Sequence, residues 1–231
     1  MSFAPHDADR GRWRRHRLDE ALLYVVAGTR AGRGGLETFL EAVLSAGADV
    51  IQLRDKEAEA SSLLRAGAVF KAAAERHEAL FIVNDRPDLA LALDADGVHL
   101  GQDDLPPQVA RRIIGPDALI GLSTHSLEQF ASADVEADYL SAGPVFATPT
   151  KPGRPATGLD FVRGVAEYVS VGAHRRPWFA IGGLNADTLP GAIGAGARRA
   201  VVVRAVDTEE AGAAAATLRR RLDGTRGGSA A

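Results

Sequence analysis

Eight short apolar runs recur along the chain, separated by longer segments rich in alanine and leucine. The runs are apolar throughout, which is typical of parallel strands covered on both faces. Eight strand–helix units in succession predict a single (β/α)8 TIM barrel of the α/β class. The alternative is an open doubly wound sheet, but no GxGxxG follows the first run. The predicted strands are residues 21–28, 50–54, 80–84, 97–101, 119–123, 139–145, 178–183 and 200–205.

Helical patterns fill the segments between these strands. Pro87 suits the first turn of the helix after the third strand, and Asn185 is expected to be the N-cap of the helix after the seventh. Examples of the predicted helices are residues 36–46, 58–76, 126–134, 158–170 and 185–195.

The two ends of the chain fall outside this alternation. Residues 1–17 carry five arginines against two aspartates, and we expect them to form a basic, mobile N-terminal extension. The barrel is expected to span residues 18–222. Residues 223–231 are expected to be a disordered C-terminal tail.

Composition excludes several classes of protein. The chain has no cysteine, which rules out disulfides, thiolate metal sites and cysteine nucleophiles. Its net charge of −3 argues against a nucleic-acid-binding protein. No apolar run approaches the roughly 20 residues needed to cross a bilayer. We therefore expect a cytoplasmic protein that binds small molecules, with no nucleic acid or membrane partner; a homo-oligomer stays open.

Polar residues gather where the first predicted strands end, which is where the active site of such a barrel lies. Gln52, Arg54 and Lys56 alternate along the second strand and so share one face. Two cations on that face either meet an anionic ligand or pair with a barrel carboxylate. Asp85 and Asp104 follow the third and fourth strands, where they either share a Mg²⁺ ion or cap helices.

The neighbouring His99 is expected to be a buried, neutral histidine. The loops after the later strands suggest phosphate sites, because hydroxyls, a lysine and a pair of glycines follow one another there. Each of these loops is also compatible with an ordinary polar turn. The candidate residues are Ser123 after the fifth strand, Thr148, Thr150 and Lys151 after the sixth, Gly183 after the seventh, and Val203 and Arg204 at the end of the eighth.

These positions define two anion subsites at one mouth of the predicted barrel. A metal ion beside Arg54, Lys56 and Lys151 is more positive charge than a monophosphate requires, and it suits a pyrophosphate. A second subsite at the seventh and eighth strands suits a separate phosphate. The combination predicts a transferase that moves an alkyl group from a pyrophosphate to a phosphorylated acceptor.

Six motifs carry a resemblance to the thiamine phosphate synthase family, in order and at the predicted strand ends. The resemblance covers residues 20 to 206. The motifs are QLRDK at 52–56, NDRPDLA at 84–90, ADGVHLGQDDLP at 95–106, GLSTH at 121–125, GPVFATPTK at 143–151 and AIGGL at 180–184.

The resemblance implies that hydroxymethylpyrimidine pyrophosphate is joined to thiazole phosphate, giving thiamine phosphate and pyrophosphate. It implies that Mg²⁺ is held by Asp85 and Asp104, and that Arg54, Lys56 and Lys151 stabilise the departing pyrophosphate. The implied contacts of the pyrimidine substrate are Gln52, Leu53, Arg54, Asp55, Lys56, Asn84, Ser123 and Lys151. The implied contacts of the thiazole phosphate are Thr148, Pro149, Thr150, Gly183, Val203 and Arg204.

One position departs from the family pattern: Arg204 stands where the family has a serine. Two other functions therefore stay open. The first is an isomerase resembling the thiazole tautomerases, for which His125 after the fifth strand would be the acid or base. The second is a non-catalytic sensor of a phosphorylated ligand. Retention of Asp85, Asp104, Lys56 and Lys151 favours the synthase, because an isomerase of a monophosphate has no use for a metal–pyrophosphate site.

Overall fold

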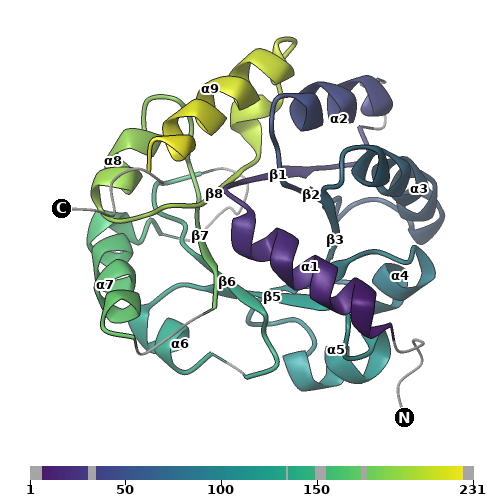
Figure 1. Ribbon diagram of the computed structural model, residues 1–231, viewed down its shortest axis with the longest axis horizontal. Helices are drawn as coiled ribbons and strands as arrows, with labels where there is room; N and C mark the ends of the chain where they lie inside the picture. The colour runs from purple at the N-terminus through teal and green to yellow at the C-terminus, as the bar shows by residue number, and fades with distance from the viewer. Residues whose placement is uncertain (1–6, 31–34, 134, 149–154, 173–175, 226–231) are drawn as a thin grey trace.

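The computed structural model describes residues 7–30, 35–133, 135–148, 155–172 and 176–225. Within these ranges, parallel strands close into a barrel in the order β1 to β8 (Figure 1). Closure joins β1 to β8, with Tyr24 opposite Val201, and it confirms the (β/α)8 barrel. The strands are β1 (Leu23–Ala27), β2 (Val50–Leu53), β3 (Leu80–Asn84), β4 (Gly97–Leu100), β5 (Leu119–Thr124), β6 (Tyr139–Ala142), β7 (Trp178–Ile181) and β8 (Ala200–Val202).

Helices surround the strands on the outside of the barrel (Figure 1). They are α2 (Leu36–Ser45), α3 (Ala60–Arg76), α4 (Pro87–Ala92), α5 (Pro107–Ile114), α6 (Leu127–Ala131), α7 (Gly158–Ser170), α8 (Leu189–Gly194) and α9 (Ala211–Asp223), with a 3-10 turn, η1 (Arg204–Val206), before α9. None of the described helices is both long and apolar enough to span a membrane.

The helix starts test two of the sequence predictions. Pro87 is the first residue of α4, as predicted. The prediction for Asn185 is wrong, because α8 begins at Leu189 with Thr188 as its N-cap. The Asn185 Oδ1 atom instead accepts hydrogen bonds from the backbone N–H groups of Asp187 and Thr188, so this side chain shapes the turn that precedes the helix.

The strand residues divide between two apolar layers. Val25 points outward and packs in the layer between strands and helices. Its neighbours Tyr24 and Val26 point inward and pack with Tyr139 and Phe179 inside the barrel. This period of two is the ordinary alternation of a strand, and it explains why the runs read as apolar throughout: both faces are buried.

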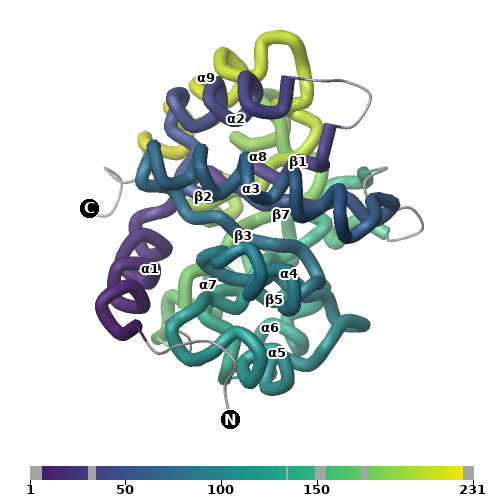
Figure 2. The backbone as a smooth tube through the Cα atoms, turned by 90° about the vertical axis from the view of Figure 1, so that its right-hand side faces the viewer, coloured from purple at the N-terminus to yellow at the C-terminus, as the bar shows by residue number. Residues whose placement is uncertain are grey.

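Helix α1 (Ala8–Glu20) corrects the prediction of a mobile extension. Figures 1 and 2 show it lying across one end of the barrel. Arg14 is only 5% exposed, and its guanidinium donates to the Asp96 carboxylate at 3.0 Å and to the backbone carbonyls of Ala95 and Asp117. These acceptors precede β4 and β5, so α1 covers the end where the strands begin.

A run of arginines is usually solvated, which is why the sequence alone predicted a mobile extension. Here Arg10 donates to both carboxylate oxygens of Asp94, and Arg15 donates to the carbonyl of Pro116. The arginines of α1 therefore bind carboxylates and exposed carbonyls beneath the strands. Residues 1–6 of the predicted extension lie outside the described residues.

The prediction of a disordered tail from residue 223 is also wrong at its start. Asp223 ends α9, and Thr225 is 7% exposed. The carbonyl of Thr225 accepts a hydrogen bond from Arg198 at 2.7 Å, which ties this segment to the barrel. Residues 226–231 lie outside the described residues.

Candidate active site

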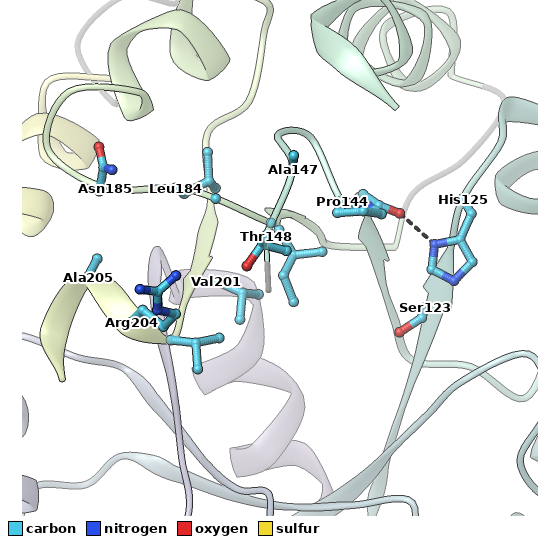
Figure 3. A pocket seen from close by; sticks show the side chains of 15 residues that line it. Ser123, His125, Pro144, Ala147, Thr148, Leu184, Asn185, Val201, Arg204 and Ala205 are labelled. Atoms are coloured by element: carbon cyan, nitrogen blue, oxygen red, sulfur yellow. Dashed lines mark hydrogen bonds between the residues drawn. The ribbon is translucent and has the colours of Figure 1, made fainter. Parts of the chain in front are cut away.

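The ends of β5 to β8 surround a cavity of about 370 Å³ at the end of the barrel opposite α1 (Figure 3). The strands end here in loops rather than in further sheet, so backbone N–H groups and polar side chains face the space. Six of its lining residues were singled out from the sequence: Ser123, His125, Thr148, Gly183, Val203 and Arg204. We call this space the acceptor cavity.

Close packing between two loops shapes the wall of the acceptor cavity. The N–H groups of Val145 and Phe146 donate to the carbonyls of Ile181 and Gly182, so the loop after β6 lies directly on the end of β7. A Cβ atom at Gly182 would lie 2.4 Å from the Cα atom of Pro144. Glycine is therefore required here by the approach of the loop, which turns Gly183 toward the cavity.

Arg204 brings an uncommitted positive charge to the acceptor cavity. Its side chain is exposed, lines the cavity (Figure 3), and makes no hydrogen bond or ion pair with any residue that the structure describes. His125, on the opposite wall, is committed: its Nδ1 atom is hydrogen-bonded to the Gly143 carbonyl (Figure 3). The arrangement favours Arg204 over His125 as a contact for a mobile anion.

A second, smaller space of about 40 Å³ lies at the barrel axis and adjoins the acceptor cavity, since Ser123 and Val203 line both. We call it the central cavity. Gln52, Arg54 and Asn84 face it from β2 and β3. The period-two prediction for Gln52 and Arg54 is therefore correct.

Two members of the QLRDK motif lie elsewhere. The Leu53 side chain is 1% exposed and packs in the outer layer against the helices, so only its backbone can meet a ligand. Asp55 accepts hydrogen bonds from the N–H and the hydroxyl of Thr29. Its carboxylate thus holds the loop after β1 against the end of β2.

An acidic pair lies beside the central cavity, at the ends of β3 and β4. Asp85 forms an ion pair with Lys56 at 2.9 Å, and its N–H donates to the His99 carbonyl. The Asp104 Oδ2 atom accepts from the N–H of Gly101 at 2.7 Å. Neither aspartate caps a helix, because the N-caps of α4 and α5 are Arg86 and Pro106.

The two carboxyl groups are hydrogen-bonded to one another, and their pKa values are driven apart. Burial acts to raise the pKa of Asp85, but the hydrogen bond from Asp104 and the positive charges of Lys56 and Arg54 outweigh it, so this pKa lies below its usual range. Burial and the neighbouring Asp85 raise the pKa of Asp104. Two neighbouring carboxyl groups whose pKa values shift in opposite directions mark a site of concentrated negative potential.

This donor set fits a hard divalent cation. Mg²⁺ prefers one or two carboxylates and completes its shell with water and substrate phosphate oxygens. Asp85 and Asp104 supply the two carboxylates, and a cation there would offset the repulsion between them. No group of three or more metal-binding side chains occurs among the residues that the structure describes, so most ligands of such an ion would come from substrate and water.

Pro149, Thr150 and Lys151 lie outside the described residues, and their predicted contacts stay predictions. His99 is buried, as expected, at 8% exposure. Sequence reasoning missed Tyr24 and Tyr139, whose hydroxyls lie 3.0 Å apart inside the barrel. A signal was present, because a tyrosine at an inward strand position needs a hydrogen-bond partner for its hydroxyl.

Comparisons with known proteins place the chain in a family. Residues 23–206 match the family model described as thiamine monophosphate synthase. The chain is 54% identical over 211 residues to the thiamine-phosphate synthase of Thermobifida fusca, covering 90% of this chain and 95% of the relative. It is 52% identical over 216 residues to the enzyme of the same name from Saccharopolyspora erythraea, covering 90% and 96%.

A solved structure is similar as well. The thiamine phosphate pyrophosphorylase of Pyrococcus furiosus superposes with a TM-score of 0.78 at 35% identity, covering 91% of this chain and 98% of that one. The match of the family model spans β1 to the end of η1, and therefore both cavities and the acidic pair. The chain belongs to the thiamine monophosphate synthase family.

Proposed function

We propose that this protein is a thiamine phosphate synthase, which joins hydroxymethylpyrimidine pyrophosphate to thiazole phosphate and releases pyrophosphate. One observation carries the proposal: two adjoining cavities share a wall, with an acidic pair and cations beside one and an uncommitted arginine at the other. The arrangement suits two phosphorylated substrates whose reacting ends meet where the two cavities adjoin.

The pyrophosphate is assigned to the ends of β2, β3 and β4. Arg54 faces the central cavity, and its side chain makes no hydrogen bond or ion pair with another described residue. Lys56 is within 2.9 Å of Asp85, and binding of a cation by Asp85 would free the Lys56 ammonium for a phosphate oxygen. Both cations, with Lys151, would stabilise the charge that grows on the leaving pyrophosphate.

We assign Mg²⁺ to Asp85 and Asp104. When bound there, it would neutralise charge on the pyrophosphate oxygens and so improve the leaving group. The thiazole phosphate is assigned to the acceptor cavity, where Gly183 and Val203 offer backbone N–H groups, Thr148 a hydroxyl and Arg204 a guanidinium. These roles are inferred from position and chemistry together with family membership.

The bond changes require no nucleophile or base from the protein. The carbon–oxygen bond to pyrophosphate breaks with its electron pair going to the pyrophosphate oxygen. The aminopyrimidine ring delocalises the positive charge left on the methylene carbon. The thiazole nitrogen then supplies its lone pair to form the new carbon–nitrogen bond, and no proton is lost. The chain's residues position the two substrates and exclude water.

The decisive experiment measures pyrophosphate release and thiamine phosphate formation together. It uses the pyrimidine pyrophosphate with and without thiazole phosphate, and with and without Mg²⁺. We expect release that needs the metal and equals thiamine phosphate formed. If the folded protein released no pyrophosphate under any of these conditions, that result would contradict the synthase and favour the isomerase or the sensor.

Asp85→Ala and Asp104→Ala variants test the metal assignment. We expect turnover to fall by two or more orders of magnitude in each, because removing one carboxylate disrupts both the charge and the geometry of the site. Asp88→Ala is the matched control, since Asp88 is exposed on α4 and pairs with Arg86. Near-normal turnover of Asp85→Ala without added metal would overturn the assignment. A cytoplasmic location and the absence of nucleic acid and membrane partners stay predictions from composition.

A further inference from the structure

A continuous line of side-chain hydrogen bonds crosses the interior of the barrel. The Nε2 atom of Gln52 donates to the Tyr24 hydroxyl at 2.5 Å, and the Tyr24 and Tyr139 hydroxyls are 3.0 Å apart. The Tyr139 hydroxyl is 3.2 Å from His99 Nδ1, and His99 Nε2 is 3.0 Å from Ser123 Oγ. We call these five side chains the polar chain; they come from β2, β1, β6, β4 and β5 in turn.

The polar chain is shielded from solvent over its whole length. Its members are between 0% and 8% exposed, and the two tyrosine rings pack edge-on against Phe179. An unpaired donor or acceptor at this depth costs about 1–3 kcal/mol. Each hydrogen in the line is therefore expected to be held to an acceptor.

A glycine makes room for the middle of the polar chain. A Cβ atom at Gly121 would lie 2.2 Å from the Tyr139 ring and 2.4 Å from His99 Nδ1. Only the absence of a side chain at this inward position lets the phenol and the imidazole reach one another. The packing of β5 therefore specifies the contact between Tyr139 and His99.

The hydrogen bonds of the polar chain run in one direction. A phenol has a single hydrogen to donate. Because Gln52 donates to Tyr24, the Tyr24 hydrogen goes to Tyr139, and the Tyr139 hydrogen goes to His99 Nδ1. The imidazole then carries its hydrogen on Nε2 and donates to Ser123. Burial raises the pKa of Tyr24 and of Tyr139 far above the usual value, so both phenols keep the hydrogens that this direction requires.

The two ends of the polar chain face the same space. Gln52 and Ser123 both line the central cavity, and so do Tyr24 and His99, whose hydrogens are already donated along the chain. With Nε2 turned to Tyr24, the Gln52 side chain presents its carbonyl oxygen as an acceptor, and it makes no other hydrogen bond to a described residue. Ser123 Oγ accepts from His99 and, at 3.5 Å, from Ser141, so its own hydrogen is the donor left for a ligand.

We propose that Tyr24, Tyr139 and His99 are positioning residues that fix Gln52 as an acceptor and Ser123 as a donor toward the pyrimidine substrate. An aminopyrimidine is complementary to this pair, because its amino group donates and its ring nitrogens accept. The polar chain thus selects a ring that carries an amino group over one that lacks it. This inference rests on the proposed function, and it assigns the pyrimidine ring to the central cavity, between Gln52 and Ser123.

The test removes hydroxyls without removing rings. In Tyr139→Phe and in Tyr24→Phe the direction of the chain is lost, and the Gln52 amide is free to turn over. We expect the KM for the pyrimidine pyrophosphate to rise about tenfold, while the KM for thiazole phosphate stays within twofold. We also expect the preference for the natural substrate over its desamino analogue to fall at least tenfold, because a site that no longer fixes Gln52 discriminates less.

Two further variants keep the test decisive. The double variant Tyr24→Phe/Tyr139→Phe removes both partners of the central hydrogen bond, so no lone phenol hydroxyl stays buried, and it should lose the same discrimination. Phe179→Leu disturbs the aromatic packing around the tyrosines without removing any hydrogen-bonding group of the polar chain, and it should keep the discrimination of the unmodified protein.

Two results would overturn the inference. The first is that the tyrosine variants keep the preference for the natural substrate over its desamino analogue. The second is that Phe179→Leu loses this preference as fully as the tyrosine variants do. Binding of the pyrimidine pyrophosphate and its desamino analogue, measured by calorimetry, gives the discrimination without turnover. A protein that binds both but makes no thiamine phosphate would contradict the proposed function and leave the test of the polar chain intact.

Discussion

At the scale of single residues, Arg204 is an exposed cation at the wall of the acceptor cavity. The guanidinium lines the acceptor cavity and is uncommitted among the described residues. An arginine can bind a phosphate through two parallel hydrogen bonds, whereas the serine of the family pattern offers one hydroxyl. The substitution therefore adds charge to the subsite assigned to the thiazole phosphate.

The prediction is that Arg204→Ser weakens binding of thiazole phosphate and leaves the pyrimidine untouched. We expect the KM for thiazole phosphate to rise about tenfold, corresponding to about 1.4 kcal/mol, because a charge-assisted hydrogen bond is lost at an exposed position. Steady-state kinetics with each substrate varied in turn measures this. Arg204→Lys, which keeps the charge, should recover part of the loss. Equal KM values for thiazole phosphate in the unmodified protein, Arg204→Ser and Arg204→Lys would contradict the prediction.

At the scale of elements, α1 joins the barrel through buried charge as well as through the apolar contact of Leu18. Arg14 and Asp96 are each only 6% exposed at the side chain and lie 3.0 Å apart. The Asp96 carboxylate also accepts from the N–H of Phe81, so it links the helix to the start of β3. Removing one partner of such a pair leaves a buried charge uncompensated.

We therefore expect Arg14→Ala to lower the free energy of unfolding by about 3–5 kcal/mol. Turnover of the folded protein should be unchanged, because α1 covers the end of the barrel opposite the cavities. Urea unfolding and kinetics at a low temperature measure the two effects separately. Arg12→Ala is the matched control, since Arg12 is exposed and pairs only with exposed Asp9. A loss below 1 kcal/mol for Arg14→Ala would contradict the prediction.

A second contact of α1 responds to pH. Burial acts to raise the pKa of Asp94, but the hydrogen bond from Arg10 and the charges of Lys71 and Arg10 outweigh it, so this pKa lies below its usual value. A lowered folded-state pKa stabilises the protein above the unfolded pKa of about 3.9, and that stabilisation disappears as the pH falls through the folded value.

The Asp94→Asn variant tests this linkage. Asn suits the left-handed backbone of this position, where φ is 48°. Because the Asp94 side chain is 66% exposed, we expect the variant to be less stable by about 1 kcal/mol or less near pH 7. That difference should shrink toward zero below pH 4. Urea unfolding from pH 3 to pH 7 measures it, and a difference that grows on acidification would refute the sign.

The elements also show what a sequence can predict. Strand positions were predictable because both faces of each strand are buried, and Pro87 marked a helix start by its fixed φ. The docking of helix α1 was not predictable, because key acceptors lie far along the chain: Asp96, which binds Arg14, is more than 80 positions away. The polar chain could not be predicted for the same reason: Tyr24 and Tyr139 are 115 positions apart, and no local sequence pattern pairs them.

At the scale of the whole molecule, the candidate site predicts a coupling between ligands and stability. A ligand that binds only the folded barrel stabilises it by about 2.7 kcal/mol at a concentration of 100 times its Kd. For a domain of this size, that corresponds to a rise of roughly 5–10 °C in the unfolding midpoint. We expect pyrophosphate to give this rise with Mg²⁺ and a smaller one without it.

Thermal scans with pyrophosphate, Mg²⁺ and both together make this measurement. Arg54→Ala should reduce the rise, since Arg54 lines the central cavity and is assigned to the pyrophosphate. Arg112→Ala on α5 is the control and should behave as the unmodified protein. A midpoint that rises equally with and without the metal would contradict a shared site for the two ions.

Helix α1 and the inner aromatic layer close the end of the barrel at which the strands begin. Among the described residues, ligands are therefore expected to enter from the opposite end, where both cavities lie. Of the two cavities, the central cavity is the deeper, since its floor includes Tyr24 and Val26. We expect ordered binding, in which the substrate assigned to the central cavity binds before the substrate assigned to the acceptor cavity.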